Sequence, residues 1–427
     1  MSLDIASLLV FIAVIAVAFF RKNNIGILAL GTGVIAVRLF GLSDRDLLGA
    51  ISVSLFTTLV GITLLFAVIT KTGALELLAK KIVALAGRRV WLIPIMLFIA
   101  GFSIVACGPG GVPALAIVPP LAVAIALQVG YNPTMLALIG ISGMTTGRFS
   151  GITPESAIIL NAISTSGFRG NISLTITVNL FITNAIIALA LYLIYGGYKV
   201  KAPLDPISAS GLEKFTPRQV VALLSILVML FLIIVAGVNI GLAAFLVATA
   251  LLLFHVADDA ECIKTIPWST VVMVLGVGAL LSIVAKTGGI KLLNDALASL
   301  MTSSTAAPFM GLSAGLLSLV SSALGVVYPT MMPMCVELAN QVGGVNPAAL
   351  MSAVAAGGAL SGISPMSTGG ALILAAIFGE GAIPYSKEAE NGVFVQLLVA
   401  AAANLVLLLI VSALFYNSIA NVFCPMG

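Results

Sequence analysis

The chain has 427 residues, of which 61% are hydrophobic and 8% are charged, and its formal net charge is +4. A soluble domain carries about 25% charged residues, so this composition excludes soluble, disordered and nucleic-acid-binding proteins. Four cysteines stand far apart with no CxxC pair and a single histidine, which argues against a zinc site or a disulfide framework. We predict an all-α polytopic membrane protein that contacts lipid and needs no cofactor.

Ten stretches are apolar enough to cross a bilayer, which takes about 20 residues. In chain order they cover residues 3–20, 25–42, 50–70, 134–166, 172–197, 219–237, 239–256, 268–285, 347–379 and 393–417. Asp4 lies at the N-terminal end of the first stretch and Arg21 and Lys22 follow it, which is the reverse of a secretory signal peptide. We therefore expect the first span to be retained.

Two further apolar stretches, residues 91–129 and 306–342, are interrupted near the middle. The interruptions read Cys-Gly-Pro-Gly-Gly-Val-Pro at 107–113 and Gly-Val-Val-Tyr-Pro at 325–329. Backbone groups freed by Gly and Pro must be buried in protein or line a wet cavity. Each stretch is therefore predicted to form a re-entrant helical hairpin, with two short spans joined by a tight turn as the alternative.

Spans 134–166 and 347–379 are also predicted to be broken, at residues 147–154 and 361–365. A moderately polar arm precedes each hairpin, at 71–89 and 286–304, and is expected to lie along the membrane surface.

These features recur in the same order, and the sequence repeats weakly with them. Lys-Thr-Gly at 71–73 matches 286–288, Asn-Pro at 132–133 matches 346–347, and Ser-Gly-Ile-Thr-Pro at 150–154 matches Ser-Gly-Ile-Ser-Pro at 361–365. The matches predict a duplication, with residues 1–198 and 219–427 as repeats and 199–218 as a charged linker. Because a hairpin returns to its own side, each repeat crosses five times, and an odd count predicts that the repeats are inverted.

Basic residues are unevenly divided between the two predicted faces. One face carries Arg21, Lys22, Lys71, Lys80, Lys81, Arg88, Arg89, Lys199, Lys201, Lys214, Arg218, Lys264 and Lys387, and the other carries Arg38, Arg45, Arg169, Lys286 and Lys291. Since cytoplasmic loops are enriched in Lys and Arg, we expect the first face in the cytoplasm and both termini outside, in the inner membrane.

Inverted repeats with broken helices are typical of secondary transporters, and the breaks mark the substrate site. Pro113, Pro154, Pro329 and Pro365 each suit the first turn of a helix that begins near the midplane. Thr153 and Ser364 are the expected N-caps. Each helix N-terminus carries about +0.5 of a charge, so four converging ends favour a dianion.

Arg148 is the one basic residue expected inside the hydrocarbon zone, where a charge costs about 2.5–3.5 kcal/mol. It has two interpretations. The guanidinium could clamp a substrate carboxylate bidentately, or it could form a buried pair with Glu155.

The breaks supply the candidate binding residues. For the substrate these are Arg148, Gly110, Gly111, Thr153, Ser322, Gly325, Tyr328, Ser364, Ser367 and Thr368. For sodium, which prefers hard oxygen ligands, they are Cys107, Gly108, Thr145, Thr146, Ser150, Ser321, Gly358 and Ser361. Glu155 and Glu337 are the only acids expected in the membrane, and such a shortage favours Na⁺ over H⁺ as the coupling ion.

The ordered set of arms, hairpins and broken spans resembles the ion transporter superfamily. Within it, the chain is similar to the MatC-type dicarboxylate carriers, which are related to the divalent anion:sodium symporters. Those symporters carry Ser-Asn-Thr at both hairpin tips, whereas this chain has Cys-Gly-Pro-Gly-Gly at 107–111 and Ser-Ser-Ala-Leu-Gly at 321–325. The resemblance implies a rigid scaffold, a mobile transport domain, elevator-like alternating access and commonly a homodimer.

The expected function is sodium-coupled uptake of a small dicarboxylate, with malonate, succinate, fumarate and malate as open choices. The large membrane subunit of a tripartite, binding-protein-dependent carrier is one alternative, and a cation antiporter or channel is another. An enzyme is not expected, because the chain has neither a GxxxxGK[ST] loop nor an HExxH motif.

Overall fold

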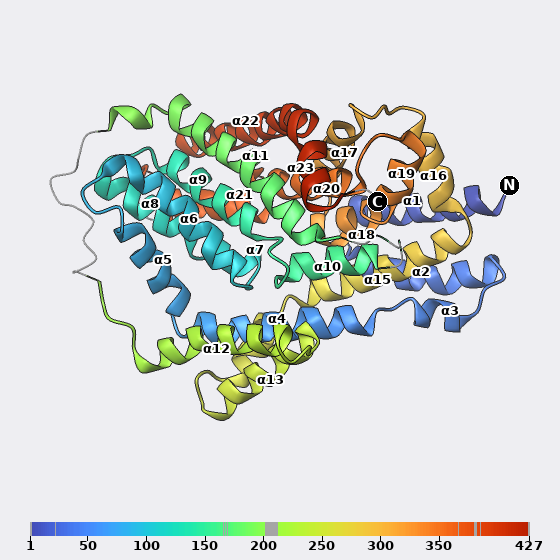
Figure 1. The fold of residues 1–427 in the computed structure, drawn as a ribbon, viewed down its shortest axis with the longest axis horizontal. Coiled ribbons are helices and arrows are strands. Elements are labelled where there is room, and N and C mark those ends of the chain that lie inside the picture. The colour runs from blue at the N-terminus through green and yellow to red at the C-terminus, as the bar shows by residue number, and fades with distance from the viewer. Residues whose placement is uncertain are drawn as a thin grey trace.

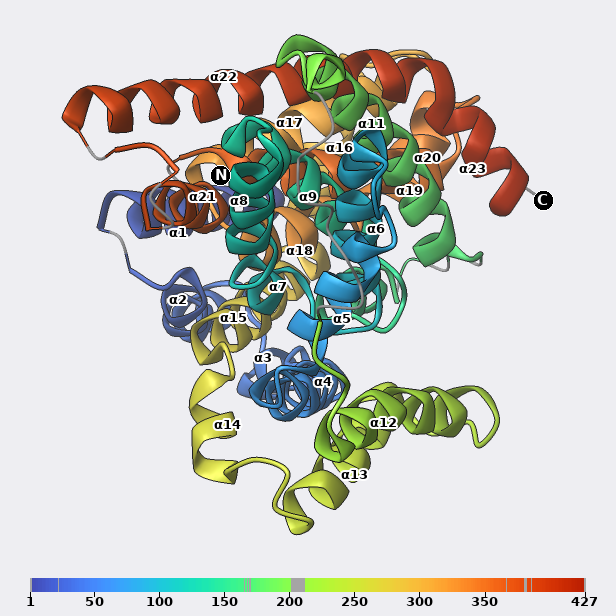
Figure 2. The same cartoon turned by 90° about the vertical axis from the view of Figure 1, so that its left-hand side faces the viewer.

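The computed structural model describes residues 2–21, 23–164, 166, 168, 170–200, 212–365, 367–379, 382–384 and 386–425. Every regular element in this part of the chain is a helix. Helices α11 (Ile172–Ile194) and α22 (Lys387–Val411) lie along one edge of the molecule, and α4 (Val53–Lys71), α12 (Pro217–Ile234) and α13 (Ile240–Leu253) lie toward the opposite edge (Figures 1 and 2). The interrupted helices lie between these two edges. Most of the predicted linker, residues 201–211, falls outside the described residues.

The remaining helices of the first half are α1 (Leu3–Arg21), α2 (Ile25–Leu39), α3 (Asp44–Gly49), α5 (Ala74–Ala84), α6 (Ile93–Ala106), α7 (Gly111–Leu115), α8 (Val118–Val129), α9 (Pro133–Gly147) and α10 (Pro154–Ile163). The first predicted hairpin is thus interrupted at 107–110, and the span 134–166 is broken at 148–153. The short turn η1 (Val90–Leu92) lies between α5 and α6, and η2 (Gly197–Lys199) follows α11.

The second half contains α14 (Asp259–Thr265), α15 (Trp268–Lys286), α16 (Gly289–Ala298), α17 (Ala306–Val320), the π-turn η4 (Ala323–Val327), α18 (Tyr328–Met331), α19 (Met334–Val342), α20 (Pro347–Leu360), η5 (Ser361–Ile363), α21 (Thr368–Gly379), η6 (Ser412–Tyr416) and α23 (Asn417–Phe423). The short helices α3 and α14 were not predicted. Helix α22 begins at Lys387, within the stretch that we expected to be a loop before residue 393.

Six described helices are long and apolar enough to cross a membrane by length and composition. They include α4, α11, α12, α15 and α22, whereas α1, α2, α6, α13, α17, α20 and α21 supply shorter apolar stretches of 10–17 residues. Exposed large apolar side chains cover the outer helices, as Leu227, Phe231 and Ile234 do on α12. Such a surface suits contact with lipid rather than with water.

Matching residues begin matching helices in the two halves. The Asn132 side chain accepts a hydrogen bond from the Met135 amide at the start of α9, and Asn346 accepts one from the Ala348 amide at the start of α20. Each is followed by Pro at the first helical position, where the missing N–H costs nothing. Gly73 and Gly288, with φ of 71° and 87°, each precede the arm helices α5 and α16, and only glycine adopts that backbone conformation readily.

Glycines also allow helices of different halves to approach closely. A Cβ on Gly61 of α4 would lie 2.4 Å from the Gly241 carbonyl oxygen of α13, and one on Gly276 of α15 would lie 2.2 Å from the Gly26 carbonyl oxygen of α2. Lys71 and Lys286 are 215 positions apart, and the same offset relates Gly26 to Gly241 and Gly61 to Gly276. The two helix pairs therefore use equivalent residues with their partners exchanged.

The broken helices pack on the hairpins in an equivalent way. A Cβ on Gly143 of α9 would lie 2.0 Å from the Phe98 carbonyl oxygen of α6, and one on Gly357 of α20 would lie 2.0 Å from the Gly311 carbonyl oxygen of α17. Contacts this short leave no room for any side chain. Close backbone packing thus fixes each broken helix against the first helix of its own hairpin.

Candidate functional site

Helix α10 begins at the first break, as the sequence predicts. Thr153 is its N-cap and Pro154 its first residue, and the Thr153 hydroxyl accepts a hydrogen bond from the Ser156 amide. The same hydroxyl donates to the Arg148 carbonyl oxygen across the break. Thr153 therefore holds the two ends of the broken helix together. It also sets the direction of Glu155, which is the second residue of α10.

Glu155 is 2% exposed, and its carboxylate reaches the tip of the first hairpin. Oε1 accepts hydrogen bonds from the Gly111 amide at 2.8 Å and from Arg148 Nε at 3.1 Å. Oε2 is buried and has no hydrogen-bond partner among the described residues. A buried carboxylate oxygen without a partner is costly, so this atom is a position where a cation, a proton or water would be stabilised.

Both interpretations of Arg148 therefore have a basis in the geometry. The ion pair with Glu155 is present, and the Arg148 side chain is 17% exposed. The pair uses only Nε, and no hydrogen bond within the described residues engages Nη1 or Nη2. Glu155 can thus orient the Arg148 guanidinium, while Nη1 and Nη2 stay available to donate two parallel hydrogen bonds to a carboxylate.

The hairpin tip is shaped to fit this pair. Gly110 has a φ of 78°, and a Cβ there would lie 2.7 Å from Glu155 Oε2. A Cβ on Gly111 would lie 2.9 Å from Arg148 Nε. Glycine at both positions allows the backbone to approach the charges directly. A negative group is favourable at the exposed amides of a helix start, and here Glu155 itself fills the place that the sequence predicted for the substrate.

The second half reaches the site through Tyr328. Its ring packs edge-on against Phe149 of the first break, with centroids 5.8 Å apart, and its hydroxyl donates to the Ala355 carbonyl oxygen at 3.2 Å. A Cβ on Gly358 would lie 2.7 Å from the Tyr328 ring, so Gly358 makes room for the tyrosine. Phe149 was not predicted as a site residue. Its position next to Arg148 within the predicted break could have indicated it.

One predicted helix start in the second half is wrong. Pro329 lies in the first turn of α18, as predicted, although the second arm of the predicted hairpin already begins with the π-turn η4, where the Ser322 hydroxyl accepts a hydrogen bond from the Gly325 amide. Helix α21 begins only at Thr368, and the Ser367 hydroxyl accepts a hydrogen bond from the Gly370 amide at 3.3 Å, so Ser364 and Pro365 lie before this helix. A hydroxyl nearer the start of α21 thus binds its free amide.

The expected convergence of four helix ends is also reduced. Helix α7 has only five residues and α18 has four, whereas α10 has ten and α21 has twelve. A full end charge needs several aligned turns. Within the described residues no hydrogen bond joins Ser322 or Gly325 to Arg148, and a Cβ on Gly325 would overlap the Met273 side chain of α15, so this tip packs on α15. Its Leu324 nevertheless lines the cavity that contains Glu155.

Four of the eight predicted sodium residues donate their hydroxyl to a backbone carbonyl. Ser150 donates to the Ala106 carbonyl at 2.8 Å, and Ser361, its counterpart in the second half, donates to the Gly315 carbonyl at 2.8 Å. Thr146 and Ser321 donate to the carbonyls of Ser142 and Leu317. A hydroxyl whose proton is engaged keeps its lone pairs, so these oxygens can still accept a cation.

The other predicted sodium residues are Cys107 and Gly108 at the first predicted hairpin tip, Thr145 in α9 and Gly358 in α20. Cys107 is the C-cap of α6, and a Cβ on Gly108 would lie 2.3 Å from the Phe66 ring of α4. Thr145 is 5% exposed. Within the described residues no group of three or more His, Cys, Asp or Glu side chains could hold a metal ion.

Two cavities lie at opposite ends of α10. The first, of about 320 Å³, has Glu155 and Ile158 of α10 in its wall together with the hairpin tip, α4 and the start of α15. The second, of about 400 Å³, is lined by Ile158, Asn161 and Ser164 together with α15, the start of α4 and the second hairpin. Helix α10 therefore has a cavity at Glu155 near its start and a second cavity at its C-terminal end.

The walls of the two cavities are built from equivalent residues. An offset of 215 positions relates the two linings. The cavity near Glu155 has Leu59, Thr63, Ala67, Thr70, Thr265, Pro267 and Thr270 in its wall. Their counterparts in the second cavity are, in the same order, Val274, Gly278, Ser282, Ala285, Ala50, Ser52 and Leu55. These lining positions on α4 were not predicted from the sequence. The repeated Lys-Thr-Gly motif that follows α4 and α15 was the signal that could have found them.

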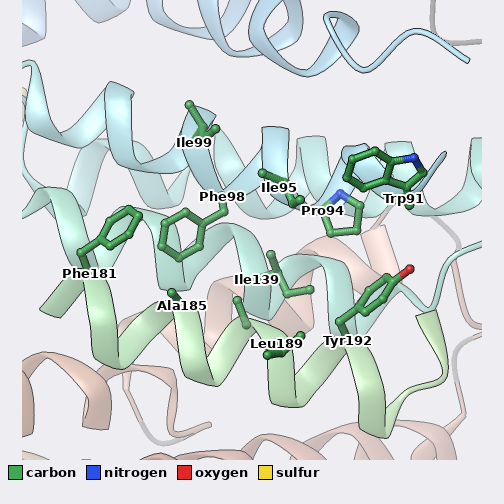
Figure 3. A pocket seen from close by; sticks show the side chains of 11 residues that line it. Trp91, Pro94, Ile95, Phe98, Ile99, Ile139, Phe181, Ala185, Leu189 and Tyr192 are labelled. Carbon is green, nitrogen blue, oxygen red and sulfur yellow. The ribbon is translucent and has the colours of Figure 1, made fainter. Parts of the chain in front are cut away.

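A third hollow lies on the outer face of α6, α9 and α11 and has a volume of about 360 Å³ (Figure 3). Its wall is formed by apolar and aromatic side chains such as Trp91, Phe98, Phe181 and Leu189, with Tyr192 at one end. No charged side chain lines it. It therefore lacks the groups that would bind an anion, whereas the cavity beside Glu155 has charged and polar side chains in its wall.

Apolar outer helices, interrupted helices at the centre and one buried ion pair beside a cavity define a multi-pass membrane transporter. The citrate transporter family (CitMHS) matches residues 9–357, and the chain belongs to this family. It is thus a secondary transporter and not an enzyme. No curated protein sequence matches it significantly.

Solved structures show the same fold at low sequence identity. The YdaH transporter of Alcanivorax borkumensis is 12% identical, with a TM-score of 0.57 over 87% of this chain and 86% of that one. MtrF of Neisseria gonorrhoeae, described as one of a class of antimetabolite efflux pumps, is 16% identical, with a TM-score of 0.59 over 90% and 84% of the two chains. The predicted kinship with the ion transporter superfamily is confirmed, whereas the narrower kinship with MatC-type carriers stays a prediction.

Proposed function

We propose that this transporter moves a small di- or tricarboxylate across the inner membrane by alternating access. The observation that carries the proposal is the free fork of Arg148: its Nε is held by Glu155, its two outer nitrogens make no hydrogen bond within the described residues, and Glu155 lines a cavity of about 320 Å³. A carboxylate matches such a fork bidentately. The family description adds citrate to malonate and the four-carbon dicarboxylates as candidate substrates.

Matched contacts in the two halves support an inverted duplication with an elevator-type movement. The exchanged glycine contacts of α4 with α13 and of α15 with α2 would form a scaffold, and the hairpins with α9, α10, α20 and α21 would move against it. The two equivalent cavities on either side of α10 would then be the vestibules that open to opposite faces. Secondary transporters built in this way rock one part around a site near the midplane.

Sodium is the proposed coupling ion. Hydroxyl oxygens at both breaks, among them Ser150 and Ser361, keep free lone pairs, and hard oxygen ligands suit Na⁺. A proton is the second candidate, because Glu155 is buried with one unpartnered oxygen that could carry it. Protonation would weaken the hold of Glu155 on Arg148 and on the hairpin tip.

Proteoliposomes can separate the two ions. Purified protein is reconstituted alone and tested for uptake of labelled malonate, succinate, fumarate, malate and citrate under either a sodium gradient or a pH gradient with equal sodium on both sides. Accumulation under the sodium gradient only is expected. Strong accumulation under the pH gradient that is lost in Glu155→Gln would assign the coupling to the proton, and absence of uptake without added partner proteins would favour a tripartite carrier.

A further inference from the structure

Each of the two cavities has a lysine at its edge, and the two lysines are paired differently. Lys71 at the end of α4 lines the cavity that contains Glu155, and its counterpart Lys286 ends α15 beside Ala285 of the second cavity. Lys71 Nζ is 3.8 Å from Glu261 Oε2, whereas Lys286 Nζ is 2.8 Å from Asp46 Oδ1. Asp46 and Glu261 are themselves 215 positions apart, so the two ion pairs are equivalent.

The acidic partners differ in how firmly they are held. Glu261 also accepts a hydrogen bond from Lys264 at 2.9 Å, so its charge stays compensated when Lys71 leaves. Asp46 is fixed by the amide and the hydroxyl of Ser43 in a capping box and has no second lysine. Departure of Lys71 therefore costs little, whereas departure of Lys286 would break a short bond to a fixed carboxylate.

The wall near Lys71 can also receive an anion. Thr70 lines this cavity, its buried Oγ1 has no hydrogen-bond partner among the described residues, and Thr270 lies in the same wall. In the second cavity the equivalent positions are Ala285 and Leu55, which offer no side-chain donor, and its hydroxyls come from other positions such as Ser282 and Thr330. The cavity near Lys71 thus combines a loosely paired ammonium with an unpartnered hydroxyl at the adjacent residue.

We propose that Lys71 with Thr70 forms an encounter site for carboxylate anions at the mouth of the Glu155 cavity. The Lys71 ammonium exchanges Glu261 for a carboxylate of the incoming or departing substrate, which then passes between α4 and the hairpin tip toward Arg148. Lys286 stays on Asp46 and serves as a structural link only. The inference rests on the proposed transport of carboxylates and adds a site that is distinct from Arg148 and Glu155.

The test compares Lys71→Gln with Lys286→Gln, which is its matched control at the equivalent position. Zero-trans flux of citrate and of malonate is measured in proteoliposomes of known orientation, separately from each face and at low and high ionic strength. Lys71→Gln is expected to raise KM about threefold to tenfold from the Lys71 face at low salt, with little change in maximal rate, because a charge at the mouth of a cleft raises the local concentration of anions. Lys71→Arg should keep the low KM, and high salt should reduce the difference.

Glu261→Gln separates an encounter site from a simple structural link. It leaves Lys71 charged and unpaired, so KM from that face should fall or stay constant. If the pair only fastened α4 to α14, Glu261→Gln and Lys71→Gln would lower the melting temperature together and change transport alike. That result, or an equal rise in KM for Lys286→Gln at its own face, would overturn the inference.

The outcomes also separate this inference from the proposed function. Normal wild-type flux with an unchanged KM in Lys71→Gln refutes the encounter site alone. Absence of wild-type flux for every carboxylate refutes both the proposed function and the site that rests on it.

Discussion

Replacing Arg148 by alanine tests whether the arginine serves Glu155, the substrate or both. The replacement leaves the Glu155 carboxylate 2% exposed, with the Gly111 amide as its one remaining described partner. Removing one member of a buried ion pair costs about 3–5 kcal/mol, because the other charge stays uncompensated. We therefore expect Arg148→Ala to lower the melting temperature clearly and to abolish uptake.

The double variant Arg148→Ala with Glu155→Gln removes the stranded charge. An amide at position 155 can still accept the Gly111 hydrogen bond, so most of the lost stability should return. Transport should not return, since the fork that binds carboxylate is still missing. Arg148→Lys should retain little transport, because an ammonium cannot bind both carboxylate oxygens in a planar arrangement.

The assay is a two-by-two cycle of melting temperature in detergent and carboxylate uptake in proteoliposomes. Loss of transport in the double variant at near-normal stability supports direct substrate binding by Arg148. Restored transport in the double variant would refute it and leave the arginine with a structural role only. Glu155→Gln alone completes the cycle and shows whether orientation of the guanidinium by Glu155 matters for KM.

Three further predictions follow from the packing. Single cysteines at residues 108–111 and at 325–328 should be labelled by a membrane-impermeant reagent from opposite faces, and labelling of both from one face would refute the inverted topology. Gly143→Ala should destabilise the protein by about 1–3 kcal/mol in thermal unfolding, because its Cβ would lie 2.0 Å from the Phe98 carbonyl oxygen, whereas Gly31→Ala, with nothing within 4 Å, should not. Tyr328→Phe should keep the ring packing on Phe149 but lose about 0.5–1.5 kcal/mol with the bond to Ala355, and an unchanged melting temperature would contradict that contact.

The interruptions were predictable because they depend on local chemistry. Thr153 before Pro154 carries its capping group within a few residues, and the structure uses it as expected. Asn132 before Pro133 caps α9 in the same way, although it was noted in the sequence only as part of the repeat. The second half was harder because several hydroxyls compete there. Ser364 and Ser367 both precede α21, and the sequence does not reveal which of them faces the free Gly370 amide.

The cavities and the ion pairs could not be predicted because they depend on distant segments. Glu261 meets Lys71 only after α14 has folded back against α4, and the glycine contact of Gly61 with Gly241 joins helices from different halves. The repeat in the sequence predicts which residues of the two halves are equivalent, since the offset taken from the Lys-Thr-Gly motif relates all these contacts. It does not predict that each residue contacts a partner from the other half, because that pairing arises only in the assembled fold.

The two predicted repeats share packing contacts but not charges. At the breaks the offset between halves is 211 positions, which relates Ser150 to Ser361, yet it aligns Arg148 with Ala359 and Glu155 with Met366. Both breaks share the hydroxyl contact with the helix before them, because Ser150 donates to the Ala106 carbonyl oxygen and Ser361 to the Gly315 carbonyl oxygen, whereas the ion pair belongs to one break. On the proposed mechanism this asymmetry is expected, because equivalent packing lets the cavities on either side of α10 open in turn while one charged pair binds the same substrate in both states. A second arginine at the other break would add a further buried charge in the membrane, at a cost of about 2.5–3.5 kcal/mol.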